Sequence, residues 1–169
     1  MQLFTARLAM RPLQSSDWPL FLQLHQNPTV IRYCYDMPSE AFVRSRFEQR
    51  LKSWDSTSTH PLCLVVFDKY SNEPMGVTGF TYGLEQAELG YLFLPAYFNQ
   101  GFASESLRAV IEWAWQQCGI TQFKAVVTKG NIGSEKVLQK CGLTLTGINT
   151  QAHTINNTRY DDLIYTLKL

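Results

Sequence analysis

A strand-like segment that runs into a glycine-containing turn is the first place where this sequence could hold chemistry. Residues 88–105 read Glu-Leu-Gly-Tyr-Leu-Phe-Leu-Pro-Ala-Tyr-Phe-Asn-Gln-Gly-Phe-Ala-Ser-Glu. A helix is predicted to open at Gly101, so the unpaired N–H groups of its first turn would point at one place, at the positive end of the helix dipole. Such a turn can bind a pyrophosphate without a cationic side chain, and glycine lets the backbone approach it closely. One glycine before a helix is also common where nothing binds.

A second polar segment, residues 127–143, contains Asn131 and Ser134. Asn131 is expected to close a strand and Ser134 to cap a short helix, and these local roles alone would account for both residues. The sequence lacks the other common phosphate-binding motifs, since neither G-x-x-x-x-G-K-[ST] nor G-x-G-x-x-G occurs in it.

Composition limits the class of protein. With 169 residues, of which 45% are apolar, the chain can bury one sizeable core and is predicted to be a single domain over 1–169. A net charge of +1 with scattered basic residues argues against nucleic acid as a partner. The sequence shows neither a signal peptide nor a membrane-spanning run, so we expect a cytoplasmic protein with no membrane partner. The four cysteines lie far apart, without a C-x-x-C pair or a histidine cluster, which predicts reduced, mostly buried thiols and no metal site.

Periodicity arranges the chain as alternating strands and helices. Alternating patterns predict strands over 8–13, 61–68, 75–82, 87–94 and 123–128, and two long strands that meet near Asn156. Helical spacing and capping residues predict helices that start at 15–17 and 38–40, and helices over 101–117 and 134–141. The second helix should carry on one face Val43, Phe47, Leu51 and Trp54. The predicted order is β-α-α-β-β-β-α-β-α-β-β.

Together and in this order, the two polar segments resemble the GNAT superfamily, the GCN5-related N-acetyltransferases, and more closely its RimJ/RimL-type group of ribosomal-protein (alanine) N-acetyltransferases. The matching stretches cover almost the whole chain and are Ala6–Leu13, Glu88–Tyr91, Tyr97–Ser106, Asn131 with Ser134, and Gln139–Leu143. Two positions depart from the pattern. Phe98 stands where the superfamily prefers Arg or Gln, and Gln100 stands where this group often has Lys, so the turn lacks cationic side chains.

The resemblance implies an α/β (α+β) fold, with a mixed, mostly antiparallel central sheet of about seven strands flanked by four helices. It implies acetyl-CoA as acyl donor, bound without a metal in a V-shaped opening between the fourth and fifth predicted strands. An N–H near Leu92 would polarise the thioester carbonyl, and the main chain of Phe93 and Leu94 would pair with the pantetheine. Asn131 would bind the pantetheine arm. The pyrophosphate would lie on Gln100, Gly101, Phe102, Ala103 and Ser104.

Glu88 is the candidate general base, acting through a water, because it lies on the strand beside the proposed groove; a salt-bridged strand carboxylate is the alternative. Ser134 could protonate the departing thiolate or only cap its helix. Further proton-transfer candidates are Tyr91, Tyr160 and His153. The resemblance places the acceptor pocket at Tyr33 and Tyr35 and at the hairpin around Asn156. Nearby, Asp161 and Asp162 could attract a cationic amine, or they could only protect a strand edge from aggregation.

The implied activity is transfer of an acetyl group to a primary amine by direct attack in a ternary complex. A lysine amine with a pKa near ~10.4 costs roughly 4 to 5 kcal/mol to deprotonate at pH 7, whereas an α-amine near ~7.8 costs about 1 kcal/mol. We therefore expect the N-terminal α-amine of a protein or peptide as acceptor. Two alternatives stay open, namely a small amine such as an amino acid, polyamine or aminoglycoside, and a non-catalytic acyl-CoA-binding module. Because strand edges in this family often pair, a homodimer is one expected assembly.

Overall fold

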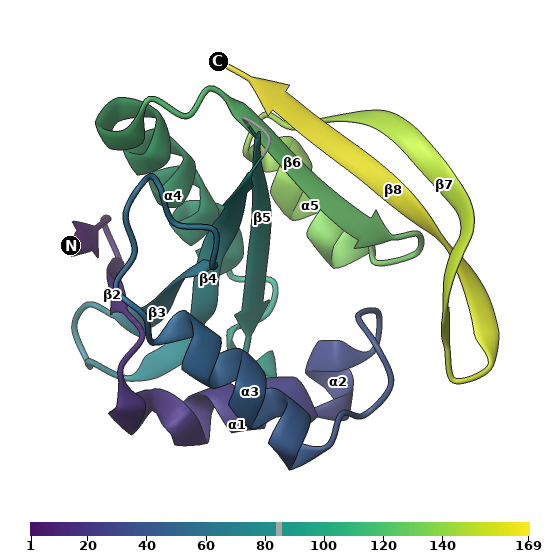
Figure 1. Cartoon of the computed structure of the whole chain (residues 1–169), viewed down its shortest axis with the longest axis horizontal. Helices are drawn as coiled ribbons and strands as arrows, with labels where there is room; N and C mark the ends of the chain where they lie inside the picture. The colour runs from purple at the N-terminus through teal and green to yellow at the C-terminus, as the bar shows by residue number, and fades with distance from the viewer. Residues whose placement is uncertain (84–85) are drawn as a thin grey trace.

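A single eight-stranded sheet organises the molecule. The computed structural model describes residues 1–83 and 86–169. Within them the strand order is β1-β2-β3-β4-β5-β6-β8-β7 (Figure 1). The strands are β1 (Leu3–Phe4), β2 (Leu8–Pro12), β3 (Leu62–Asp68), β4 (Pro74–Gly83), β5 (Gln86–Phe93), β6 (Gln122–Thr128), β7 (Thr144–Ile155) and β8 (Thr158–Lys168). The helices are α1 (Trp18–Gln26), α2 (Pro28–Ile31), α3 (Glu40–Arg50), α4 (Phe102–Cys118) and α5 (Ile132–Lys140), with single 3-10 turns η1 (Ser15–Asp17) and η2 (Pro95–Tyr97).

The mixed, mostly antiparallel fold and the predicted order of elements are confirmed, with two short additions. Strand β1 pairs antiparallel with β2 at the outer edge of the sheet. Helix α2 has four residues and is capped by Asn27, whose side chain accepts hydrogen bonds from two backbone N–H groups of its first turn. Neither addition is long enough to produce a periodic pattern in the sequence.

The predicted face of α3 is partly wrong. Ser39 caps the helix as expected, its hydroxyl accepting from the Phe42 N–H at 3.2 Å. The helix ends at Arg50, so Trp54 lies beyond it and packs on the other side of the sheet, with its ring centroid 5.2 Å from that of Phe80. A helical repeat extrapolated past Leu51 misplaced this tryptophan because the chain had already left the helix.

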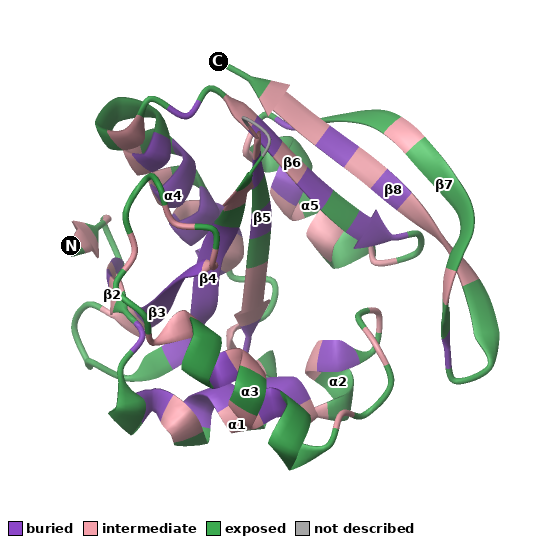
Figure 2. Ribbon diagram, in the orientation of Figure 1, coloured by how far each residue is buried: buried purple, intermediate pink, exposed green. Residues whose placement is uncertain are grey.

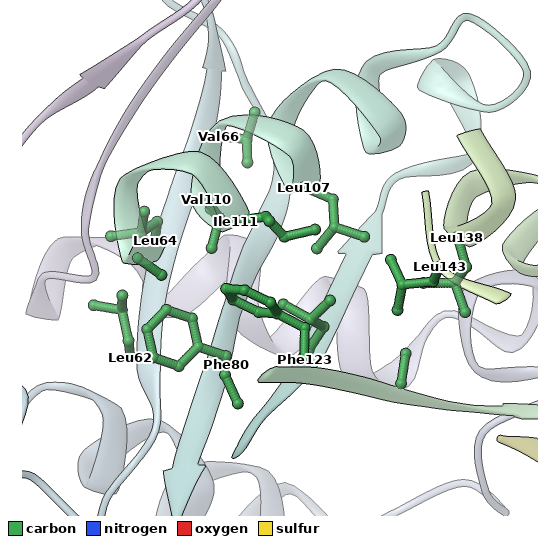
Figure 3. Close-up of a cluster of buried hydrophobic side chains, with 14 of the residues drawn as sticks. Leu62, Leu64, Val66, Phe80, Leu107, Val110, Ile111, Phe123, Leu138 and Leu143 are labelled. Atoms are coloured by element: carbon green, nitrogen blue, oxygen red, sulfur yellow. The ribbon is translucent and has the colours of Figure 1, made fainter. Parts of the chain in front are cut away.

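Helices cover both faces of the sheet, and each face has its own core (Figures 1 and 2). Helix α4 packs on one face against alternate residues of β3, including Leu62 and Leu64, in the cluster drawn in Figure 3. Helices α1 and α3 pack on the opposite face against the intervening β3 residues, Cys63 and Val65. The alternation follows from the two-residue repeat of a strand.

Strands β5 and β6 are the only neighbours in the described sheet that run parallel, and they separate soon after they meet. Their register contains only two pairs, Ala87–Phe123 and Glu88–Lys124, whereas β5 remains paired with β4 along its whole length. Beyond Glu88, β5 therefore has a backbone edge without a strand partner on its β6 side. This is where the resemblance predicts a V-shaped opening, between what were counted as the fourth and fifth strands. Residues 1–83 and 86–169 contain no helix long and apolar enough to cross a membrane.

Candidate active site

The unpaired edge of β5 can pair with an extended ligand. Backbone N–H and C=O groups on a free strand edge are hydrogen-bonding partners for another extended chain. Of the three predicted donor contacts, Leu92 and Phe93 lie on this edge. Leu94 already uses both backbone groups, since its N–H donates to the Met75 carbonyl and its carbonyl accepts from the Tyr97 N–H, each at 2.9 Å. The free part of the edge therefore ends at Phe93.

The glycine turn leads directly from this edge into α4. Gly101 is the N-cap of the helix and adopts the left-handed conformation, with φ 82°, which favours glycine. In the described chain, the N–H groups of residues 102–104 donate no hydrogen bond to a side chain or to the preceding loop. The side chain of Gln100 folds back, with its Nε2 donating to the Ala96 carbonyl at 2.7 Å. The turn and the β5 edge together fit an elongated ligand that ends in phosphate groups, as acetyl-CoA does.

A guanidinium that the sequence motif did not reveal lies beside this turn. Arg7, on the segment before β2, pairs with Glu105 in the first turn of α4 at 2.6 Å, and its Nη1 donates to the Gln100 carbonyl at 3.0 Å. Partial burial would raise the pKa of Glu105, but hydrogen bonds from Thr5 and Arg7 outweigh it and lower the pKa below its ordinary value. Arg7 therefore brings a cation to the turn, and this cation also pairs with the Glu105 carboxylate.

Asn131, rather than Ser134, caps α5. The helix begins at Ile132, and the Asn131 Oδ1 accepts from the Ser134 N–H at 3.3 Å, so the predicted capping role of Ser134 is wrong. The Ser134 carbonyl accepts from the Tyr91 hydroxyl of β5 at 3.3 Å. Burial raises the pKa of Tyr91, and its hydroxyl proton is already engaged with the Ser134 carbonyl. The Ser134 hydroxyl makes no hydrogen bond within the described chain and stays available as a donor.

Glu88 lies where β5 and β6 separate. It projects to the α1 and α3 side of the sheet, as do Gly90 and Leu92, which alternate with it along β5. Its side chain is 55% exposed and lies 3.0 Å from Lys124 Nζ. The salt-bridged interpretation of Glu88 is therefore present in the structure, and its exposure leaves room for a water that could relay a proton.

A cavity of about 330 Å³ lies on the same side of the sheet. Its floor includes the two glycines Gly79 and Gly90, which face each other across β4 and β5. Its walls come from the helices and the loop after α2, with the side chains of Phe21, His25, Tyr35, Arg46 and Arg50, and Glu88 of β5 lies on its strand floor. Sequence reasoning found Glu88 and Tyr35 but missed the helical residues, because a polar residue at the margin of an apolar helix face carries no motif.

His25 is a neutral member of this cavity. Burial lowers its pKa to about 4, against the opposing effect of the Phe21 carbonyl, and the charges of Arg50 and Arg46 lower it further. Its Nδ1 lies 2.8 Å from that carbonyl oxygen, which accepts only, so Nδ1 carries the proton and Nε2 is an acceptor.

The three predicted acceptor residues come together where the loop after α2 meets the β7–β8 hairpin. The Asn156 N–H donates to Asp36 at 2.7 Å, and the Tyr33 carbonyl accepts from Thr128 at 2.7 Å. Tyr35 lies between the cavity and a second hollow bordered by β7. Burial raises the pKa of Tyr35 to about 12, and its buried hydroxyl has no hydrogen-bond partner in the described chain.

The remaining polar candidates hold the hairpin in place. His153 on β7 contacts Thr128 through Nε2 at 3.3 Å and Asp162 through Nδ1 at 3.2 Å, and its ring stacks on Tyr160 with centroids 6.1 Å apart. Asp161 pairs with Lys129 at 3.2 Å. Both aspartates are thus engaged by protein cations or donors.

No group of three or more His, Cys, Asp or Glu residues within 1–83 and 86–169 is arranged to bind a metal ion. The expectation of mostly buried cysteines is wrong in part. Cys63 is buried, Cys118 and Cys141 are half-buried, and Cys34 is exposed on the loop after α2.

Comparison with known proteins agrees with this geometry. Residues 7–144 match the family model described as Acetyltransferase (GNAT) domain. The chain is 33% identical to the uncharacterized N-acetyltransferase YoaA of Bacillus subtilis (strain 168), over 96% of this chain and 94% of YoaA. It superposes with a TM-score of 0.86 on RimL, the ribosomal L7/L12 alpha-N-protein acetyltransferase solved with coenzyme A, at 21% identity, over 100% of this chain and 98% of RimL. It superposes with a TM-score of 0.83 on spermidine N-acetyltransferase from Vibrio cholerae solved with CoA and spermine, at 17% identity, over 97% of this chain and 96% of that protein.

The family model spans most of the chain, and the identity to YoaA extends over nearly all of both proteins. This chain therefore belongs to the GNAT family and is an N-acetyltransferase.

Proposed function

We propose that the protein transfers the acetyl group of acetyl-CoA to the N-terminal α-amine of a protein or peptide. The pantetheine would lie along the β5 edge at Leu92 and Phe93, with Asn131 beside it, and the pyrophosphate would lie on the turn from Gln100 to Ser104. The proposed compartment is the cytoplasm, as expected from the lack of a signal-peptide pattern and of a membrane-spanning run in the sequence.

The amine would bind in the cavity of about 330 Å³ described above, here called the acceptor cavity. The charge of its lining is the observation that supports a peptide α-amine as acceptor. Its only carboxylate among the described lining residues is Glu88, which already pairs with Lys124, whereas two arginines face it. A polyamine or aminoglycoside carries several positive charges and would be repelled by this lining. Solved relatives act on different amines, as the names of RimL and of the spermidine N-acetyltransferase show, so fold alone does not choose between them.

The proposed reaction is direct attack of a neutral amine on the thioester within a ternary complex. An α-amine loses its proton at a cost of about 1 kcal/mol at pH 7, which a carboxylate acting through a water can assist. We assign that role to Glu88, and its position where β5 and β6 separate supports the assignment. Backbone N–H groups near Leu92 would stabilise the charge that develops on the carbonyl oxygen. Ser134 has a free hydroxyl with which to protonate the departing thiolate.

The test is thiol release from acetyl-CoA with four classes of amine, beside a calorimetric titration with CoA. The classes are N-terminal peptides, free amino acids, polyamines and aminoglycosides. Release with peptides, and no faster release with polycations, is the expected result. Release only with polyamines or aminoglycosides would contradict the choice of acceptor. CoA binding without release from any amine would favour the acyl-CoA-binding module.

A further inference from the structure

Two arginines of α3 face the acceptor cavity without an acidic partner. Arg46 and Arg50 are four residues apart on the helix, so their side chains leave it on the same side. None of the ion pairs among residues 1–83 and 86–169 includes either of them. Of the five N–H donors that each guanidinium offers, one is used within the described chain, from Arg50 Nη1 to the Arg46 carbonyl at 3.0 Å. Neighbouring like charges destabilise a helix when no anion lies between them.

Among the described residues around the two guanidiniums, the Tyr35 side chain adds a further hydrogen-bond donor. The Tyr35 hydroxyl is buried without a hydrogen-bond partner in the described chain, although both arginines lie close enough to affect its titration. Burial lowers the pKa of Arg50, and the charge of Arg46 acts in the same direction. An incoming carboxylate would meet the unused donors and neutralise the crowded positive charge.

We propose that the acceptor carries a carboxylate close to its amine, and that Arg46 and Arg50 bind this carboxylate with Tyr35 as a further donor. This inference rests on the proposed acetyl transfer. The planar fork of a guanidinium matches a carboxylate with two parallel hydrogen bonds. The cavity volume of about 330 Å³ is enough for a compact acceptor terminus. Glu88 lies on the strand floor of the same cavity, on the strand that also carries the proposed thioester position at Leu92, and the arginines form its helical wall.

Two kinds of acceptor share this chemistry. One is a peptide whose first or second residue is Asp or Glu, and the other is a free amino acid, which has its own α-carboxylate. They can be separated with two matched pairs of product mimics. N-acetylaspartate amide and N-acetylasparagine amide test the side-chain carboxylate, and N-acetylalanine and its amide test the α-carboxylate.

Direct binding of these mimics to the CoA-loaded protein is the first measurement. In at least one pair, the carboxylate should bind about 10- to 100-fold more tightly than its amide, as a charge-assisted hydrogen bond provides. Arg46→Gln and Arg50→Gln should each remove most of that ratio. Arg44→Gln is the matched control, since Arg44 lies on the same helix but over the Trp18 ring, 3.4 Å from its centroid. If half-buried Arg50 proves necessary for folding, Arg46→Gln decides the outcome alone.

The inference is overturned if neither pair discriminates in the native protein, or if the discrimination survives both substitutions. It is also overturned if Arg46→Gln weakens CoA binding itself, because the guanidinium would then bind a phosphate of CoA.

Turnover separates this inference from the proposed function. With acidic and neutral peptides, the native protein should prefer the acidic ones through KM, and Arg46→Gln should raise KM for them while kcat changes little. Equal rates on neutral and acidic peptides, together with equal rates on alanine and alaninamide, would retain the acetyltransferase and refute the carboxylate site. Discriminating binding without thiol release from any amine would retain the anion site and refute the proposed function.

Discussion

Replacing Arg7 by Met should weaken CoA binding. Arg7 forms an ion pair with Glu105, which lies 98 residues further along the chain. The substitution would leave the Glu105 carboxylate without its cation in the first turn of α4, where the proposed pyrophosphate lies. We take the separation between the Glu105 carboxylate and the proposed pyrophosphate as about one and a half helical turns, or roughly 8 Å. At that distance, with an effective dielectric constant of ~20, two unit charges repel by about 2 kcal/mol.

Solvent screening reduces this value, because the Arg7 and Glu105 side chains are 44% and 20% exposed. A net loss of about 1–2 kcal/mol remains, which corresponds to CoA binding that is roughly 5- to 30-fold weaker. The weakening should be smaller at high salt, because the repulsion is electrostatic.

The assay is calorimetric titration of CoA into four proteins: the native chain, Arg7→Met, Glu105→Gln and the double variant. If Arg7 acts by neutralising Glu105, the double variant should bind CoA within about threefold of the native chain. Arg159→Met serves as a control, because that exposed guanidinium bonds to Gln151 on the hairpin. An Arg7→Met protein that is folded and binds CoA with native affinity would refute the reasoning, as would a double variant no better than Arg7→Met.

Three further predictions concern the floor of the acceptor cavity and its histidine. Gly90→Val should fold, since a Cβ at Gly90 meets no atom within 4 Å. Because its side chain fills the cavity, it should lower kcat/KM for the amine at least about tenfold while CoA affinity is unchanged. Unchanged acceptor kinetics would show that the amine binds elsewhere. Gly79→Ala should destabilise the fold by more than about 2 kcal/mol in urea unfolding, because its Cβ would overlap the Leu62 carbonyl oxygen. A stable Gly79→Ala protein would contradict this contact. His25 has a folded-state pKa of about 4, so between this value and ~6.5 the unfolded chain binds more protons and stability falls as pH falls. The expected loss from pH 7 to pH 5 is about 2 kcal/mol, and it should be absent in His25→Gln, whereas equal pH dependence of the two proteins would count against a neutral buried imidazole.

Local pattern was sufficient for most of the fold and for the donor turn. Strand alternation, Ser39 as a cap and the glycine before α4 all depend on residues within a few positions of one another, and these predictions were confirmed. The same local reasoning failed where two residues three positions apart could play one role. Asn131 and Ser134 are both good caps, and only the start of α5 at Ile132 shows that Asn131 is the one used.

The candidate site was predictable only in part. The loop that carries Tyr33 and Tyr35 does lie against the β7–β8 hairpin at Asn156, and the role of these residues in binding the acceptor stays a prediction. The roles of Arg46 and Arg50 in α3 were not predicted. The helical pattern identifies Val43 and Phe47 as core residues, but it does not show that the neighbouring arginines line a cavity.

By itself, the sequence determined the order of strands and helices, the glycine turn into α4 and, through resemblance, the N-acetyltransferase family. Tertiary structure decided which distant charges meet: Arg7 with Glu105 at the start of α4, and the pair Arg46 and Arg50 with a cavity floored by Gly79 and Gly90. The reason is physical. Helix and strand patterns are set by contacts within a few residues, whereas the field at a site is set by groups that only sheet order and helix packing bring within a few ångströms.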